Sequence, residues 1–240
     1  MSKRTLVYVL GDVHGDMGRL NTFIDRKIRQ HPIVKTLAED GARGGDEFRV
    51  VILQCGDMAY FWPFVDHADM IRNLIDFLPG GRVPIYWCGG NHEDWDQLDG
   101  LFSPASLADR TNMAEVEKGI FFCRFGATLE LVPDITVLFV GGAESIDKDY
   151  RLRKMRSKGC PKIWWEQEGI GEADMERLKN IPRADLIISH TAPKAFSLAP
   201  SLAGNAWDGK HIDEPSRELL MMSCENTDRK NGFSDISTNT

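Results

Sequence analysis

The sequence predicts an α/β fold in one large domain, in which short buried strands alternate with helices. Three apolar runs bounded by turn residues, Leu6–Leu10, Val50–Leu53 and Ile85–Trp87, have the length and composition of strands buried on both faces. A helical pattern of apolar residues follows the first run, within Gly18–Gln30. With 240 residues, 42% of them apolar, the chain can bury one full core, and a single domain of this class commonly reaches that length.

The first half of the chain continues with a loop and a second helix. Ala38–Glu47 is polar and rich in glycine, which predicts a loop before the second strand. The spacing of apolar residues predicts a helix over Pro63–Leu78. Pro63 suits the first turn of this helix, and Pro79-Gly80-Gly81 gives it a stop signal.

The second half of the chain contains the strands expected in a second sheet. These strands are predicted over Phe121–Val132 and Ile135–Val140, on either side of Pro133-Asp134. A short amphipathic helix over Glu172–Lys179 then precedes a last apolar run, Leu186–Ile188. No internal repeat and no interdomain linker interrupts the order.

Polar motifs follow four of these apolar runs directly. They are Asp12-Val-His14, Gly56-Asp57, Gly90-Asn91-His92-Glu93 and Ser189-His190. In open α/β sheets, ligands bind outside the carboxyl ends of the strands, so these side chains are expected at one edge. Their oxygen and nitrogen donors suit Mn, Fe, Zn or Ni and are too rich in nitrogen for a dedicated calcium or magnesium cage. No cysteine is placed to act as a ligand, which disfavours a structural zinc site.

Each motif taken alone has a plainer interpretation. Asp12 and Asp16 are suited to turns or to helix N-caps, and His14 to an ordinary loop position. Asn91 after two glycines is suited to a left-handed turn, and Glu93 to an exposed salt bridge. A metal site is favoured because the plainer interpretations do not explain why every candidate follows a strand.

The order of these motifs resembles that of calcineurin-like metallophosphoesterases. The family pattern runs Asp-x-His, Gly-Asp, Gly-Asn-His-Glu/Asp, His and Gly-His-x-His, and the resemblance covers roughly residues 5–192. It implies a four-layer αββα sandwich, in which two mixed sheets pack face to face and helices flank them. It also implies hydrolysis of phosphoesters by water that two divalent metal ions activate.

The resemblance also assigns a role to each motif residue. Asp12 and His14 would hold one ion, Asn91 and His190 the other, and Asp57 would bridge the two. Mn²⁺ is the expected metal, with Fe, Zn or Ni as alternatives. Two cations roughly 3.5–4 Å apart can stabilise both the attacking and the leaving oxygen.

The Gly-Asn-His-Glu motif adds two candidate catalytic residues beside the metal ligands. The resemblance implies that His92 would point into the site without binding metal and would stabilise the phosphoryl oxygens or protonate the leaving group. Glu93 is expected to orient the ring of His92.

Composition limits the partners and the compartment. The formal net charge of −7 disfavours long nucleic acids, whose binding requires clustered positive charge. Five scattered cysteines without a Cys-x-x-Cys pair, among them Cys55 and Cys88 at strand ends, predict reduced thiols in a cytoplasmic protein. No apolar run approaches the length of a membrane helix, and no hydrophobic signal region is expected.

Three further segments each have two interpretations. The sequence from Lys148 to Lys162 carries seven basic residues and is either a docking surface for an anionic substrate or, as we favour, a solvated loop. Trp164-Trp165 could form the floor of a substrate pocket or pack in the core. Tyr60-Phe61-Trp62 could lie beside the metals or simply pack the next helix.

The end of the chain departs from the family pattern. No Gly-His-x-His motif follows His190, and from Ser223 the composition changes to polar residues that cannot bury a strand. We therefore expect a phosphoesterase domain over residues 1–222 and a polar, disordered tail over residues 223–240. With codon boundaries moved on by two bases, Lys230–Thr238 can encode Lys-Trp-Phe-Phe-Gly-His-Phe-His, which contains the missing motif. A frameshift is one hypothesis for the tail, and a natural chain that ends differently is the other.

The sequence thus predicts a metal-dependent phosphoester hydrolase, with a phosphatase favoured over a phosphodiesterase or nuclease. A small phosphoester or a phosphoprotein is the expected substrate. Arg110, Arg124 or the Lys148–Lys162 segment could supply positive charge for it. Because the final histidines are missing, a metal-binding scaffold with impaired catalysis is the alternative of another class.

Overall fold

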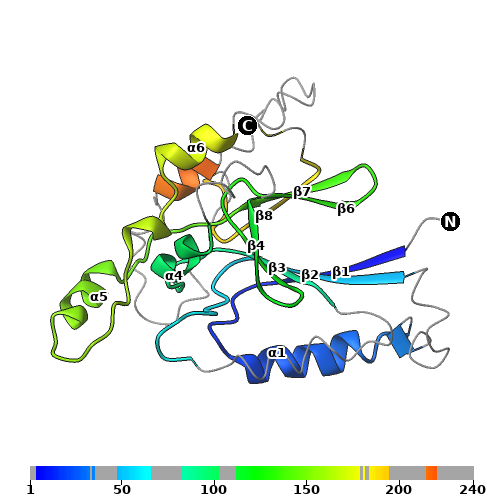
Figure 1. Cartoon of the computed structure of the whole chain (residues 1–240), viewed down its shortest axis with the longest axis horizontal. Coiled ribbons are helices and arrows are strands. Elements are labelled where there is room, and N and C mark those ends of the chain that lie inside the picture. Colours follow the sequence, from blue (N-terminus) through cyan, green and yellow to red (C-terminus); the bar gives the residue numbers. More distant parts are fainter. Residues whose placement is uncertain are drawn as a thin grey trace, which may run out of the picture.

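The computed structural model describes residues 4–32, 34–35, 48–65, 83–102, 112–178, 181, 184–194 and 215–220. Within them, the strands form two sheets that lie one above the other, with helices on the outer sides (Figure 1). The predicted loop Ala38–Glu47, most of the predicted helix Pro63–Leu78 and the tail 223–240 lie outside the described residues. So does Arg110.

The first sheet has five strands in the order β1-β2-β3-β5-β4. They are β1 (Arg4–Leu10), β2 (Phe48–Gln54), β3 (Ile85–Cys88), β4 (Met113–Glu117) and β5 (Ile120–Cys123). All neighbours run parallel except β4, which is antiparallel to β5. Side chains alternate between two buried faces, as Val50 and Ile52 in β2 face one apolar cluster while Val51 and Leu53 face another.

The second sheet has three strands in the order β6-β7-β8, which are β6 (Thr128–Val132), β7 (Ile135–Val140) and β8 (Leu186–Ser189). β7 is antiparallel to β6 and parallel to β8. Val137 and Phe139 of β7 pack with residues of the first sheet, whereas Leu138 and Val140 face outward. The two sheets therefore pack against each other through one apolar layer.

Helices cover the outer face of each sheet. On the first sheet lie α1 (Met17–Phe23), its π-helical continuation η1 (Ile24–Ile28) and α4 (Trp95–Gly100). On the second sheet lie α6 (Glu172–Leu178) and a helical segment at 215–220. The predicted α/β class and the four-layer αββα arrangement of two mixed sheets are confirmed (Figure 1). Across the described residues, no helix is long and apolar enough to cross a membrane.

Two sequence-based expectations about elements were wrong. Phe121–Val132 is not one strand of the second sheet, because a turn at Phe125-Gly126 ends β5 in the first sheet and starts β6 in the second. Gly126 has a φ of 83°, a conformation that favours glycine. The basic segment that starts at Lys148 is not simply a solvated loop, because it begins with helix α5 (Lys148–Met155), whose Arg151 is buried.

Candidate metal centre

The predicted motif residues meet at one edge of the sandwich. The parallel register aligns the ends of β1, β2 and β3, since Leu10 pairs with Gln54 and Gln54 pairs with Trp87. The end of β7 reaches the same edge, where the Gly142 backbone N–H donates to Gly89 O at 2.9 Å. A cleft of about 420 Å³ opens there, and six of the seven predicted site residues line it: Asp12, His14, Asp57, Asn91, His92 and His190.

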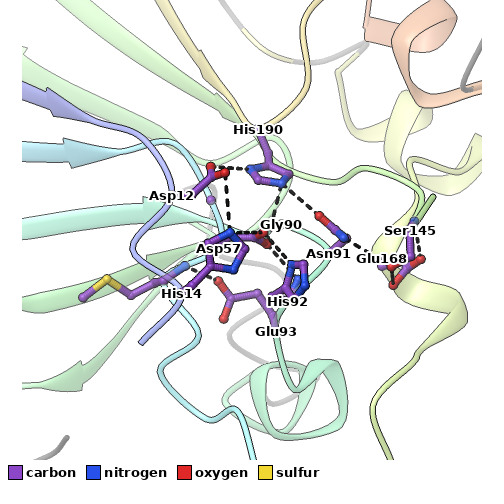
Figure 2. Close-up of polar contacts among 12 residues, drawn as sticks. Asp12, His14, Asp57, Gly90, Asn91, His92, Glu93, Ser145, Glu168 and His190 are labelled. Carbon is purple, nitrogen blue, oxygen red and sulfur yellow. Dashed lines mark hydrogen bonds and ion pairs between the residues drawn. The ribbon is translucent and has the colours of Figure 1, made fainter. Parts of the chain in front are cut away.

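The Asp57 carboxylate occupies the centre of the cleft and is 2% exposed (Figure 2). Its Oδ2 lies 3.6 Å from His14 Nε2, and its Oδ1 lies 3.6 Å from His190 Nε2. The two oxygens therefore face two different histidines. Such a carboxylate can serve a separate cation with each oxygen.

Each side of Asp57 has a further oxygen donor. On one side Asp12 Oδ2 lies 3.6 Å from His14 Nε2, and on the other Asn91 Oδ1 lies 3.1 Å from His190 Nε2. Ligand atoms with bonds of about 2.0–2.2 Å to one cation lie roughly 3–3.5 Å apart. These spacings and the mixture of carboxylate, amide and imidazole donors fit divalent Mn, Fe, Zn or Ni.

Among the described residues, His14, Asp57 and His92 form a group whose donor atoms all lie within 4.8 Å of one another. It includes His92, which the resemblance places beside the metals without binding them. The Nδ1 atom of His92 lies 2.7 Å from Asp57 Oδ2, and its backbone N–H donates to Asp57 Oδ1 at 2.7 Å. His92 thus holds both oxygens of the central carboxylate.

A second contact defines the tautomer of His92. Its Nε2 lies 2.7 Å from a guanidinium nitrogen of Arg151. A guanidinium group can only donate, so Nε2 accepts and the ring proton of the neutral imidazole is on Nδ1, where it donates to Asp57. The two ring nitrogens of His92 thus have different partners, Asp57 on one side and Arg151 on the other.

Glu93 is not among the partners that the structure gives the His92 ring nitrogens, and its expected role in orienting that ring stays a prediction. The Glu93 side chain is fully buried, and its Oε1 accepts from the backbone N–H of Met58 at 2.8 Å. Burial, reinforced by the nearby Asp57 carboxylate, raises the pKa of Glu93 well above its usual value. Glu93 supports the loop that follows Asp57.

The loops that carry the site have strained but well-supported backbones. His14 and Asp57 have φ values of 50° and 55°, which side chains other than glycine rarely adopt and which cost roughly 1–3 kcal/mol each. The two loops support each other, because the backbone N–H groups of Val13 and His14 donate to Asp57 O at 3.1 and 2.8 Å. This mutual support offsets the strain and holds Asp12, His14 and Asp57 together.

Sequence reasoning missed a polar network behind Asn91. Asn91 Nδ2 donates to Ser145 Oγ at 3.3 Å, and Ser145 donates from its backbone N–H and its hydroxyl to Glu168 at 2.7 and 2.8 Å (Figure 2). Trp164 Nε1 also donates to Glu168, at 2.9 Å. The network directs the amide nitrogen of Asn91 away from the cleft and its oxygen toward His190. The only sequence signal for it was that Ser145 follows a strand end.

Charge coupling inside the cleft shifts three pKa values. The His14 imidazole holds the pKa of Asp12 below its usual value, and the Asp12 carboxylate in turn raises the pKa of His14. Burial alone would raise the pKa of Asp57, but the hydrogen bonds from His92 and the charge of His190 outweigh burial. The pKa of Asp57 is therefore lowered.

The sequence left two interpretations for several basic and aromatic residues, and the structure places only some of them at the cleft. The Trp62 ring lies 5.4 Å from the His92 ring, and Arg151 lines the cleft. Trp165 is 1% exposed in the core, and Trp164 contacts Glu168 instead of the cleft. Arg124 pairs with Asp99 at 3.2 Å and does not line the cleft.

Comparison with known proteins places this cleft in a family. A search of curated proteins finds none that matches the chain. The model of the calcineurin-like phosphoesterase family matches residues 5–213, which include all seven predicted site residues. That span is most of the chain, and metal-dependent phosphoester hydrolysis is the chemistry that the family name and the His-Asp-His cluster support. The chain belongs to the calcineurin-like phosphoesterase family.

Proposed function

We propose that this protein is a phosphatase that uses two divalent metal ions, with Mn²⁺ preferred, to hydrolyse small phosphoesters or phosphoproteins. The observation that supports two ions is the position of Asp57, whose two oxygens face His14 and His190 separately. Asp12, His14 and Asp57 would hold one ion, and Asp57, Asn91 and His190 the other. When bound, the ions supply positive charge and lower the pKa of a water molecule enough to make hydroxide available near neutral pH.

The chain's own residues orient and assist this chemistry. Asp57 and the backbone around it keep the donor atoms of two loops in place, which catalysis requires because small displacements of reacting groups are costly. His92 lies at the cleft wall beside Asp57, where it can contact a phosphoryl oxygen or the leaving group. No Ser or Cys nucleophile beside a base lines the described part of the cleft, which favours direct attack by water over a covalent enzyme intermediate.

Several properties support a small or protein-bound substrate over long nucleic acid. The net charge is −7, and the cleft wall carries Glu144 and Asp147 in addition to the proposed ligands. Such a surface repels a polyanion, whereas one phosphate can be neutralised by the metals. The buried thiols of Cys88 and Cys123 suit a reducing compartment, and we place the activity in the cytoplasm.

Hydrolysis of phenyl phosphate, bis(p-nitrophenyl) phosphate, a phosphopeptide and single-stranded DNA in the presence of Mn²⁺ tests the proposal. We expect the monoester and the phosphopeptide to be cleaved best, and D57N to abolish the activity. In water enriched in oxygen-18, the label should enter the released phosphate in a single turnover. Efficient cleavage of DNA with little cleavage of monoesters would contradict the substrate class, and a trapped phosphorylated side chain would contradict the mechanism.

A metal-binding scaffold without turnover is the alternative function. The observation that favours it is the set of donors on the Asn91 side, where the described residues provide only Asn91, His190 and the shared Asp57. Calorimetry with Mn²⁺ separates the two functions. Two bound ions without hydrolysis of any of the four substrates would establish the scaffold.

A further inference from the structure

Arg151 differs from every other basic residue of its helix. Helix α5 (Lys148–Met155) carries three other basic residues, Lys148, Arg153 and Lys154, and all three are exposed. Arg151 is 3% exposed, although it is a charged side chain and lines the metal cleft. A buried cation is costly unless its charge and its hydrogen bonds are satisfied. Its contacts therefore indicate what it does.

Each of the three guanidinium nitrogens of Arg151 has a close protein partner. Nε lies 2.7 Å from Oδ1 of Asp147, the N-cap residue of the helix. One terminal nitrogen donates to the backbone oxygen of Asn91 at 2.7 Å, and the other lies 2.7 Å from Nε2 of His92. The guanidinium carbon also lies 5.7 Å from the centre of the Trp62 ring.

We infer that Arg151 is a positioning residue for the Asn91-His92 turn, which it locks from the side opposite Asp57. Asp57 holds the Nδ1 edge of the His92 ring and Arg151 holds the Nε2 edge, so the ring has one orientation and one tautomer. The hydrogen bond from Arg151 to the Asn91 backbone oxygen fixes the same turn. In this turn the Asn91 side chain faces His190 and the His92 side chain faces Asp57. The ion pair with Asp147 holds the Arg151 side chain in place. Helix α5 therefore contributes to the geometry of the site.

The same contacts argue against Arg151 as the group that binds the substrate phosphate. A phosphate-gripping arginine needs two parallel N–H donors directed into the open cleft. Four of the five N–H donors of Arg151 have protein partners, because Nε faces Asp147, one terminal nitrogen donates to the backbone oxygens of Asn91 and Ile163 at 2.7 and 3.5 Å, and the other donates to His92. One N–H donor is left, which is too few for a parallel pair directed into the cleft. The exposed residue Arg153 on the same helix makes none of these contacts and provides a matched control.

The tautomer of His92 gives a test that does not require activity. Nitrogen-15 spectra of histidine-labelled, metal-free protein at pH 8.5 distinguish Nδ1–H from Nε2–H rings, and the H92N variant assigns the signals. We expect His92 to be the Nδ1–H form in the wild type and in R153A. In R151M, which keeps the bulk of the side chain without its donors, the Nε2–H form should become populated. A His92 ring in the Nε2–H form in the folded wild type would overturn the inference.

A kinetic test rests on the proposed phosphatase function and separates positioning from substrate binding. With phenyl phosphate and Mn²⁺, R151M and R151K should lose about 10–100-fold in kcat, as is typical when a group that orients an active-site residue is removed. The KM and the inhibition constant of inorganic phosphate should change by less than about threefold. R151M should add little to the loss already present in H92N, because the two residues act together.

Outcomes of the two tests can be told apart. A rise in KM and in the phosphate inhibition constant at unchanged kcat would mean that Arg151 binds substrate, and the inference would be wrong. Inactivity of the wild type with the expected spectra would remove the proposed function and leave the positioning role intact. If R151M does not fold, R151A with methylguanidinium provides the second test, since the added cation should restore the Nδ1–H form of His92.

Discussion

At the scale of single residues, close backbone approach determines which side chains the site tolerates. A Cβ atom added at Gly90 would lie 2.2 Å from Asp57 Oδ1 and 2.6 Å from the Asp57 backbone nitrogen. Gly56 has a φ of 100°, and a Cβ there would lie 2.6 Å from the His190 ring. These glycines are needed for the spacing of the donor atoms, because nothing larger than hydrogen fits.

Replacement of Gly90 by alanine should therefore disable the site. The added methyl group must displace the Asp57 carboxylate, so we expect G90A to lose Mn²⁺ binding measurable by calorimetry and most of its hydrolytic activity. Gly100, at the end of α4, is the matched control, since a Cβ there meets nothing within 4 Å. G100A should keep both properties, and normal Mn²⁺ binding by G90A would show that the Asp57 carboxylate is not required where the structure places it.

The coupling between Asp12 and His14 predicts how metal binding depends on pH. The Asp12 carboxylate raises the pKa of His14, so the histidine stays protonated to a higher pH than usual, and its proton competes with a metal ion. In the metal-free protein this pair stabilises the fold below the ordinary pKa of histidine, about 6.5, and the stabilisation is lost as pH rises through the raised pKa.

Mn²⁺ affinity should consequently increase from pH 6 to pH 8.5. Calorimetry in buffers of different ionisation enthalpy measures the protons released on binding. At pH 7 the wild type should release more protons than H14A, which lacks the titrating ring. Equal proton release by the two proteins would contradict the assigned role of His14 as a ligand with a raised pKa.

At the scale of elements, the loops after neighbouring strands support one another. Glu93 follows β3 and accepts from the Met58 backbone N–H in the loop after β2. Loss of this acceptor leaves a buried donor unsatisfied, which costs about 1–3 kcal/mol. The loop after β2 carries Asp57, so this contact supports the backbone that positions Asp57.

Two substitutions separate the structural and catalytic interpretations of Glu93. E93A should lower the free energy of unfolding, measured in urea, whereas E93Q keeps an acceptor for Met58 and should not lower it. Because burial raises the pKa of Glu93, its contribution to stability falls as pH rises above the pKa of the unfolded carboxyl. The stability of E93Q relative to the wild type should therefore increase from pH 5 to pH 8. A large loss of kcat in E93Q at unchanged stability would instead support a catalytic role.

Elements also show where sequence-based prediction works and where it stops. The motifs at Asp12, Asp57, Asn91 and His190 could be placed because a short apolar run and the polar residues after it are local signals. The assignment of β5 to the first sheet could not, because the turn at Phe125-Gly126 has meaning only once both sheets exist. Because α5 is rich in basic residues, its local sequence also favours the prediction that all of them are solvent-exposed.

The burial of Arg151 illustrates the same limit. Arg151 contacts Asn91 and His92, which lie 60 and 59 positions earlier in the chain. The Asn91–Ser145–Glu168 network is similarly non-local, since its bonds span 54 and 23 positions. The candidate metal ligands were therefore predictable from motifs, whereas the residues that contact them from distant parts of the chain required the fold.

At the scale of the whole molecule, the candidate site joins the two sheets. Asp12, Asp57 and Asn91 follow strands of the first sheet, and His190 follows β8 of the second. His190 also binds across the boundary without metal, because its Nδ1 lies 2.9 Å from Cys55 O, next to the end of β2. Metal ions at this site would add bonds between two sheets that also share an apolar layer and a hydrogen bond from Arg49 of β2 to the Leu131 backbone oxygen of β6 at 3.4 Å.

Bound metal should therefore stabilise the native sandwich against unfolding. At a free Mn²⁺ concentration of about 100 times its dissociation constant, a ligand that binds only the native state adds about 2.7 kcal/mol, and for a chain of this length that raises the Tm by roughly 5–10 °C. Scanning calorimetry with and without Mn²⁺ measures the increase. D57N should lose nearly all of it, because Asp57 faces both donor sets, whereas H190A should lose only part and keep the Asp12-His14 side. A full increase in H190A would mean that the second sheet contributes no ligand, and the metals would then belong to the first sheet alone.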